Sequence, residues 1–381
     1  MGATRFRIWY GDRAASLEEL ALIEQIEVTQ EMDAFWEAQV RVALCLDAQG
    51  RWQHGPGEAA EPFSRVRIEV DLGDGSFTPL IDGPLTSVDA ALDAQPGRST
   101  ATMLVRDDSA YLDRDEAIEP PFEARADSDI ADELFRRFEQ IGDTRIDATT
   151  ATPATTTRRG TVLQFLRELA DANDRHAYVL PGEVPGASIG CFLADPVDAA
   201  ELPPLRLSGD DRNLSNASIT QDPDGAERTQ AQVLRVDDQG VTVFETDAAE
   251  LGLMRDLPAV ATDLSPTRLL SPADNTREDP AAAASAQART RSYIYQLTSE
   301  LVPGRYGAVL SPYRKVRVDA GATPYSGDYL ITKVVHRITP SLYLQQLEAK
   351  SDGITEISDA AVAETDGGGI NPAVSASGGI F

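Results

Sequence analysis

The stretch IEVTQEMDAFWEAQVRV, residues 26–42, has a counterpart later in the same chain. In ASITQDPDGAERTQAQVLRV, residues 217–236, the order of a β-branched residue, Thr, Gln and an acid is repeated, so that Val28 aligns with Ile219. Both segments then reach Ala-Gln-Val and Arg-Val. A single match of this length is compatible with chance, so its value depends on whether others follow in the same order.

Two further matches do follow in that order. RVRIEV at 65–70 is similar to KVRVDA at 315–320, and LTSVDAAL at 85–92 is similar to ITKVVHRI at 331–338. Apolar and polar residues alternate in these blocks, which is typical of half-buried β-strands. Three matches in one order predict an internal duplication of a β-rich unit.

The distance between the copies changes along the chain. It is 219 − 28 = 191 residues at the first match and 315 − 65 = 250 at the second, so the second copy contains an insertion of about 59 residues, which we place within 237–313. There, DPAAAASAQARTRSYIYQLTSELVPG, residues 279–304, predicts a long helix with Asp279 as N-cap. Its small residues suit packing against another chain, and a solvated helix remains the alternative.

Residues 107–205, between the copies, differ in pattern. We expect one helix at 128–142 and a second that begins near Val162 and ends at Asn173-Asp174, because their apolar residues recur at helical spacing. Extended segments at 176–180 and 187–196 follow. These elements predict a small sheet covered by helices.

The composition is strongly acidic. The 381 residues include 34 Lys and Arg against 62 Asp and Glu, a net charge of −28, and such a surface repels nucleic acid and anionic lipid. A salt-tolerant or high-GC source and a negatively lined channel both remain open as explanations. No apolar run is long enough for a membrane helix, and MGATRFRIWYGD lacks a signal-peptide core, so synthesis in the cytoplasm is expected.

No pattern indicates catalysis. His54, His176 and His336 lack neighbours at metal-ligand spacing, and neither a nucleophile motif nor a phosphate-binding loop occurs. Cys45 and Cys191 lie in apolar contexts that indicate reduced, buried thiols. DPDGAE at 222–227 lacks the ligands of a calcium loop. We therefore expect no catalytic residues, no cofactor and no metal.

A resemblance to a known family appears in three segments. TVLQFLRELADANDRHAYV, residues 161–179, is similar to a signature of phage late-control protein D and of the N-terminal part of VgrG spike proteins. YSGDYLITKVVHRI, residues 325–338, resembles the strand that closes their last barrel, and residues 79–115 resemble their first barrel and its exit. The resemblance covers about residues 5–353 through loose motifs.

The resemblance implies a mainly β fold with α insertions (α+β): two tube-like β-barrel domains from the duplication, plus helical and mixed insertions. The domains expected are a first barrel (1–106), an α+β insertion (107–205), a second barrel with a helical insertion at about 237–313 (206–353), and a Gly/Ala/Ser-rich tail (354–381). It also implies a structural, non-enzymatic homotrimer, because three chains of a duplicated domain present six similar domains to a six-fold tube and three chains to a spike.

The expected role is the central baseplate hub of a contractile injection system or phage tail, with an inner tube protein, a spike protein and baseplate wedge components as partners. The chain shows no β-helical spike region, so the spike is expected to be separate. Ile370, Ile380 and Phe381 in the tail are the expected partner-binding residues. Two alternatives remain: a tube-initiator or distal tail protein of a non-contractile phage, and a particle-associated cell-wall hydrolase.

Overall fold

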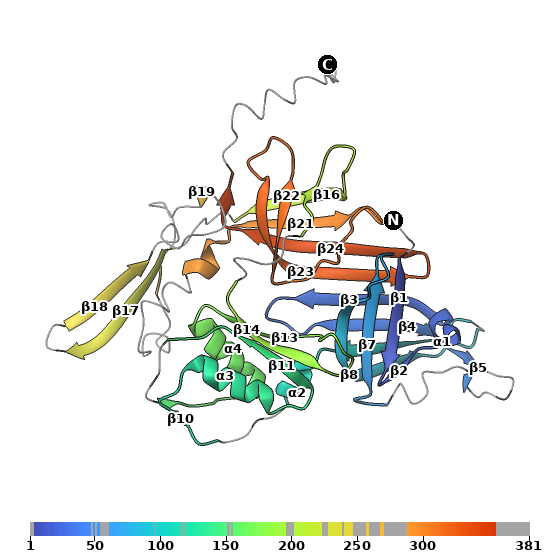
Figure 1. Cartoon of the computed structure of the whole chain (residues 1–381), viewed down its shortest axis with the longest axis horizontal. Helices are drawn as coiled ribbons and strands as arrows, with labels where there is room; N and C mark the ends of the chain where they lie inside the picture. Colours follow the sequence, from blue (N-terminus) through green and yellow to red (C-terminus); the bar gives the residue numbers. More distant parts are fainter. Residues whose placement is uncertain are drawn as a thin grey trace, which may run out of the picture.

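The structure is a computed structural model (Figure 1). It describes residues 4–46, 49, 52–53, 61–95, 97–114, 116, 119–150, 153, 155–195, 202–222, 228–237, 240–246, 257–258, 267–269 and 288–355. Most of the described elements are strands, and one antiparallel sheet dominates, in the order β16-β21-β24-β23-β3-β4-β9-β8-β7-β1-β2. This sheet runs through both copies of the predicted duplication, and the α+β unit lies beside it.

The first barrel unit is a sheet that curls over its own core. Its elements are β1 (Arg5–Tyr10), β2 (Arg13–Ala14), α1 (Leu17–Ala21), β3 (Ile23–Glu31), β4 (Glu37–Ala43), β5 (Cys45–Leu46), β6 (Trp52–Gln53), β7 (Arg65–Asp71), β8 (Thr78–Ala91) and β9 (Thr100–Arg106). The long strand β8 turns the corner, pairing with β7 through its first half and with β9 through its second. Gly83 lies at this corner, where a Cβ would be 2.0 Å from the carbonyl oxygen of Arg106.

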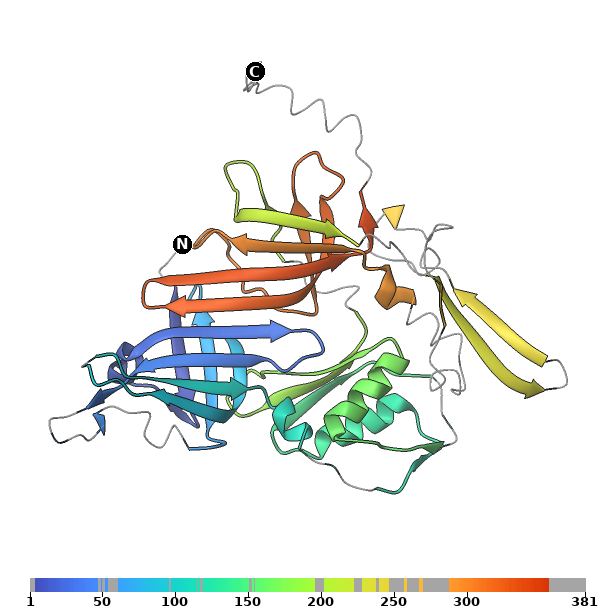
Figure 2. The ribbon, with the colours of Figure 1, turned by 180° about the vertical axis from the view of Figure 1, so that it is seen from behind.

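The α+β unit follows. Its elements are α2 (Ser109–Leu112), β10 (Phe122–Glu123), α3 (Asp127–Arg136), β11 (Ile141–Ile146), β12 (Thr155–Thr156), α4 (Val162–Ala172), β13 (His176–Leu180) and β14 (Ser188–Leu193). Helices α3 and α4 lie against the sheet β11-β14-β13, as Figure 2 shows from behind. The apolar face predicted for α4 is buried, and Thr161 forms a capping box with Gln164 at its start.

The second barrel unit repeats the first with fewer outer strands. Its elements are β15 (Leu205–Arg206), β16 (Leu214–Gln221), β21 (Tyr295–Leu301), β22 (Arg314–Asp319), β23 (Gly327–Thr339), β24 (Leu342–Ser351) and β25 (Gly353–Ile354). Between β16 and β21 the chain makes an excursion that contains β17 (Arg228–Asp237), β18 (Gly240–Thr246), β19 (Leu257–Pro258) and β20 (Thr267–Leu269). Strands β17, β18 and β20 form a sheet of their own.

The two barrel units are equivalent strand by strand. The order β3-β4-β9-β8-β7 in the first corresponds to β16-β21-β24-β23-β22 in the second. The residue pairing agrees as well: Arg65 opposes Pro84 between β7 and β8, and Lys315 opposes Leu330 between β22 and β23. Arg65 and Lys315 begin the second sequence match, and Pro84 and Leu330 directly precede the third. The fold class expected from the sequence is therefore confirmed.

Two irregularities in the pairing recur at equivalent positions. The β3–β4 ladder is interrupted between Ile23 and Gln25. The β16–β21 ladder is interrupted between Leu214 and Asn216, and each of these residues lies 191 positions after its equivalent in β3. The β8–β9 and β23–β24 ladders are likewise interrupted at Leu85–Ser87 and Ile331–Lys333, which the third sequence match aligns. Since a β-bulge bends and twists its strand, equal bulges give both units the same curvature.

Three expectations from the sequence are wrong. Ala-Gln-Val-Leu-Arg-Val at 231–236 belongs to β17 of the excursion, and the equivalent of β4 is β21. The excursion therefore starts after β16 and not within 237–313. The helix expected over 279–304 is also wrong in its second half, because residues 295–301 form β21; residues 279–287 lie outside the described part.

The helix expected at 128–142 is too long. Helix α3 ends at Arg136, and Ile141 begins β11. Phe138 and Ile141 continue the helical apolar spacing, yet the chain leaves the helix because Ile141 pairs with Ser188 in the small sheet. Strand pairing therefore overrides a local pattern that favours a longer helix.

Candidate functional site

The two barrel units are joined through one pair of strands. Strand β3 of the first pairs with β23 of the second over six residues, from Glu31 opposite Lys333 to Ile26 opposite Ile338. Ile26 and Ile338 are buried in one continuous hydrophobic core. The open edge of the first unit is thus covered by the second, and Figure 1 shows the four strands β24, β23, β3 and β4 running side by side.

A chain of hydrogen bonds crosses this junction. The Nε2 atom of Gln30 donates to the carbonyl oxygen of Leu80 at 2.7 Å, which leaves Oε1 of Gln30 as an acceptor. That oxygen lies 3.3 Å from Nε2 of His336, whose Nδ1 lies 2.8 Å from the hydroxyl of Tyr343. A neutral imidazole, protonated at Nε2, satisfies every member. Complete burial lowers the pKa of His336 to about 3, which keeps it neutral.

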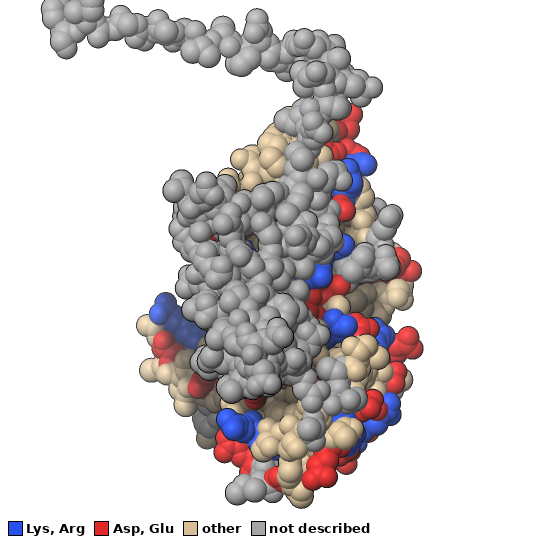
Figure 3. All heavy atoms as spheres, turned by 90° about the vertical axis from the view of Figure 1, so that its left-hand side faces the viewer, with Lys and Arg blue, Asp and Glu red and all other residues tan. Residues whose placement is uncertain are grey.

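The solvent-facing side of the same sheet carries ion pairs across neighbouring strands. The cationic and acidic partners are Lys333 with Glu31 (2.9 Å), Arg337 with Glu27 (2.7 Å), Arg106 with Glu37 (2.7 Å) and Arg41 with Glu24 (2.9 Å). Basic and acidic side chains are also interspersed on the described surface in Figure 3. This face is mixed in charge, so it is not lined by carboxylates alone.

Among the open strand edges of the described residues, two belong to strands that are equivalent to β3 and β23. Strand β16 ends the sheet on one side and pairs only with β21. The second half of β8 pairs with β9, and no described strand pairs with its outer edge beyond Leu85. Leu92, just after β8, is 65% exposed, whereas its equivalent Ile338 is 2% exposed.

A polar junction joins the α+β unit to both barrels. His176 of β13 contacts Asp33 of the β3–β4 turn through Nδ1 (3.0 Å) and Asp195 through Nε2 (3.1 Å). The hydroxyl of Tyr293, next to the second barrel unit, donates to the other oxygen of Asp195 at 2.8 Å. The backbone N–H of Asp33 donates to the hydroxyl of Tyr313 at 2.7 Å. Three parts of the chain are therefore tied together at one point.

The charges at this junction are set by their neighbours. Burial by itself lowers the pKa of His176, but its hydrogen bonds to Asp195 and Asp33 raise it to about 9. Burial raises the pKa of Asp195, yet the bond to His176 and the charge of Lys350 bring it to about 2. The pair is therefore an imidazolium and a carboxylate at neutral pH. The arrangement ties the α+β unit to both barrel units through buried charges.

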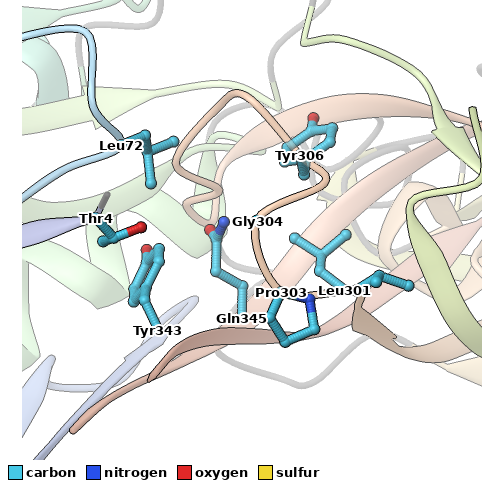
Figure 4. A pocket seen from close by; sticks show the side chains of 9 residues that line it. Thr4, Leu72, Leu301, Pro303, Gly304, Tyr306, Tyr343 and Gln345 are labelled. Atoms are coloured by element: carbon cyan, nitrogen blue, oxygen red, sulfur yellow. The ribbon is translucent and has the colours of Figure 1, made fainter. Parts of the chain in front are cut away.

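Two cavities lie at these junctions. One of about 250 Å³ lies beside His176, and Asp33, Asp195 and Lys350 are among the residues that line it. Figure 4 shows a cavity between the first barrel unit, at Thr4 and Leu72, and the second, at Tyr306, Tyr343 and Gln345. Its volume is about 30 Å³, which is close to the space of one water molecule. Within the described residues, no three His, Cys, Asp or Glu side chains are arranged so that they could hold a metal ion, and no helix there is long and apolar enough to span a membrane.

The residues singled out from the sequence lie in different environments. Burial raises the pKa of the Cys191 thiol to about 12, whereas Cys45 is exposed, contrary to expectation. His176 and His336 both hold junctions between units. His54 and the predicted partner-binding residues Ile370, Ile380 and Phe381 lie outside the described residues.

The contribution of Gln30 to the barrel junction was not predicted from the sequence. Its signal was a polar residue on the apolar face of β3, in the series Ile26, Val28, Gln30. A buried polar side chain in such a position requires a partner, and only the fold shows that this partner is His336.

Solved structures share this fold. A tail protein from Neisseria meningitidis has a TM-score of 0.61 and 15% identity, over 93% of this chain and 98% of that one. The 43 kDa tail protein of prophage MuSo2 from Shewanella oneidensis has a TM-score of 0.65 and 13% identity, over 92% and 100%. No protein-family model matches the sequence, and a search of curated proteins finds no match.

Secretion proteins share the fold more distantly. A component of the type VI secretion system of E. coli, described as structurally similar to tail proteins of bacteriophage T4, has a TM-score of 0.53 and 10% identity, over 86% of this chain and 73% of that one. A chain of the Francisella PdpA–VgrG complex has a TM-score of 0.55 and 10% identity, and the match spans 93% of this chain and 59% of that one.

Proposed function

We propose that this chain is the central baseplate hub of a contractile injection system or phage tail. It acts as a homotrimeric, non-enzymatic adaptor between a hexameric inner tube and a trimeric spike, and it is a component of the assembled particle. The proposal depends above all on the equivalence of the two barrel units in strand order, in pairing and in bulge position. A three-fold assembly of such a chain presents six similar barrels.

The fold neighbours support the structural part of this role. They include two tail proteins, one of them from a prophage, that match this chain over nearly the whole length of both partners. The buried polar groups support it as well, because the clusters around His176 and His336 both hold junctions between units. The first cluster also borders a cavity of about 250 Å³. A hub transmits force during sheath contraction, and joints of this kind keep its parts in fixed relative positions.

The solvent-facing side of the sheet is the proposed wall of the tube lumen. Its cross-strand ion pairs neutralise several charges, and Glu300 and Glu348 add further carboxylates to the same face. The result is a polar surface that carries both signs of charge. Neutralising one cation of this face should change cargo passage more than particle assembly.

The tail is the proposed contact to the spike or to a neighbouring subunit. Residues 367–381 are rich in small residues, and Ile370, Ile380 and Phe381 are its large apolar side chains. Deletion of 367–381 should release the spike from purified particles while the hub remains trimeric. Unchanged spike retention would contradict this assignment.

Native mass spectrometry of the isolated chain tests the central part of the proposal. The chain has a mass of 41.0 kDa, so a trimer has 3 × 41.0 = 123 kDa. Addition of the inner tube and spike proteins should give a complex with six tube subunits and one spike trimer. A monomer or dimer that binds neither protein would contradict the hub, and clearing of peptidoglycan in a zymogram would favour a hydrolase.

A further inference from the structure

The sheet of one chain has two complementary open edges. Strand β16 ends the sheet and is equivalent to β3. The second half of β8 pairs only with β9 after the corner and is equivalent to β23. Within the chain, β3 and β23 pair with each other. The two open edges are therefore the counterparts of two strands that already form a known contact.

We infer that β16 of one subunit pairs with β8 of the next in the antiparallel register of β3 and β23. The internal β3–β23 pairs predict the pairs between subunits. Each residue of β3 is replaced by its equivalent in β16, 191 residues later. Each residue of β23 is replaced by its equivalent in β8, which is 331 − 85 = 246 residues earlier. The result runs as follows: Asp222 opposite Ser87, Gln221 opposite Val88, Thr220 opposite Asp89, Ile219 opposite Ala90, Ser218 opposite Ala91, and Ala217 opposite Leu92. This inference rests on the proposed trimer and names its contact.

The side chains at these positions fit such a contact. On the core-facing side, the pairing would cover Leu92, which is 65% exposed, together with Val88 and Ile219, which are partly buried. The equivalent internal positions, Ile338 and Val28, are 2% and 0% exposed. The pairing thus gives the second interface the buried face that the first already has.

The edges also lack the features that normally keep sheet edges apart. Strand β16, LSNASITQ, contains no charged residue and no proline, and its side chains are largely exposed. Residues 86–92 of the β8 edge contain one charged residue, Asp89. Monomeric proteins protect open edges with charges, prolines or short strands, so an unprotected edge of eight residues indicates a strand partner.

A second copy of this chain is the partner that fits both edges at once. The contact joins two different surfaces, so it continues from chain to chain and closes when the rotation per chain closes. The sheet from β16 to the end of β8 contributes eight strands per chain, and six equivalent strand contacts, three internal and three between subunits, would complete a ring of three chains. An added strand from another protein is the competing occupant, and it would cover one edge only.

Disulfide trapping tests the register. Ala91→Cys and Ser218→Cys are introduced together in a Cys45→Ser background, which removes the exposed native thiol. Both positions are exposed, and directly opposed residues in an antiparallel pair lie within disulfide reach. Mild oxidation of the purified full-length chain should give a covalent trimer as the largest species on a non-reducing gel.

The matched control is Ser87→Cys with Ser218→Cys in the same background. Ser87 lies on the same face of β8, but four residues from Ala91, which is about 13 Å along the strand and too far for a disulfide. It should remain uncrosslinked. Thermal unfolding of both reduced variants, compared with the parent chain, shows whether the substitutions leave the fold intact.

The outcomes separate the inference from the proposed function. Suppose that native mass spectrometry shows the 123 kDa complex. If no disulfide then forms between positions 91 and 218 of neighbouring chains, or if the control pair crosslinks, the proposed strand register is wrong although the trimer is correct. A chain that stays monomeric would overturn the trimer itself. Covalent polymers longer than three chains would show that the edges pair without closing a ring, and would overturn the closed contact.

Discussion

The junction between the barrel units should be sensitive to acid through His336. The side chain is fully buried, and its pKa is lowered from 6.5 to about 3. Because the folded pKa lies below that of the unfolded chain, the unfolded chain takes up the proton first, and stability is lost as the pH falls below about 6.5. At pH 5, about 1.5 pH units below the unfolded pKa, the free energy of unfolding is lower by about 2 kcal/mol.

The variant His336→Gln removes this titration while keeping hydrogen-bonding groups near Tyr343 and Gln30. Urea unfolding of the full-length chain, followed by fluorescence and circular dichroism at pH 7, 6 and 5, measures the effect. We expect the free energy of unfolding of the parent to fall by about 2 kcal/mol more than that of the variant between pH 7 and pH 5. Parallel pH profiles for the two proteins would refute the neutral, buried imidazole at this junction.

Three other perturbations test other parts of the structure. Because the pKa of His176 is raised to about 9, the parent should lose up to about 3 kcal/mol of unfolding free energy as the pH rises from 6.5 through 9. The variant His176→Gln should lack this loss, and an equal loss in the variant would contradict the junction. Gly83→Ala should lower stability by about 3 kcal/mol because its Cβ meets the carbonyl of Arg106, and an unchanged melting temperature would contradict the tight corner of β8. Leu92→Lys should dissociate the trimer in native mass spectrometry while the circular dichroism spectrum of the chain stays that of the folded parent, and a persistent trimer would contradict the open-edge contact.

Local patterns in the sequence were sufficient for the duplication and for helix α4. The strand matches at 65–70 and 85–92 have the same pairing in both copies, because alternation of apolar residues is tied to which face of a strand is buried. Helix α4 was equally predictable, since Thr161 caps it and its apolar residues keep helical spacing.

Elements that depend on distant partners could not be predicted in the same way. The short pattern in 231–236 imitates β4, but the strand that takes the place of β4 is β21, which begins only at Tyr295 although β16 already ends at Gln221. The alanine-rich residues before β21 favour a helix, and this preference was extended wrongly into the strand. Pairing with β16 and β24 determines the conformation of β21.

The candidate site was the least predictable part. His176 and His336 show no distinguishing neighbours in the sequence. The pKa of His176 is raised by Asp33 and Asp195, which lie in loops distant in the chain, and the pKa of His336 is lowered by its burial beside Gln30 and Tyr343. The open edges are likewise invisible in the sequence, because an edge exists only once the order of the strands is known.

Electron microscopy of the purified chain is the decisive measurement for the proposed symmetry adaptor. We expect a closed ring with three-fold symmetry in which six barrels of similar shape alternate between the first and second units around one central opening. A solitary particle, a two-fold dimer, or a three-fold particle whose two units lie at different radii would contradict it.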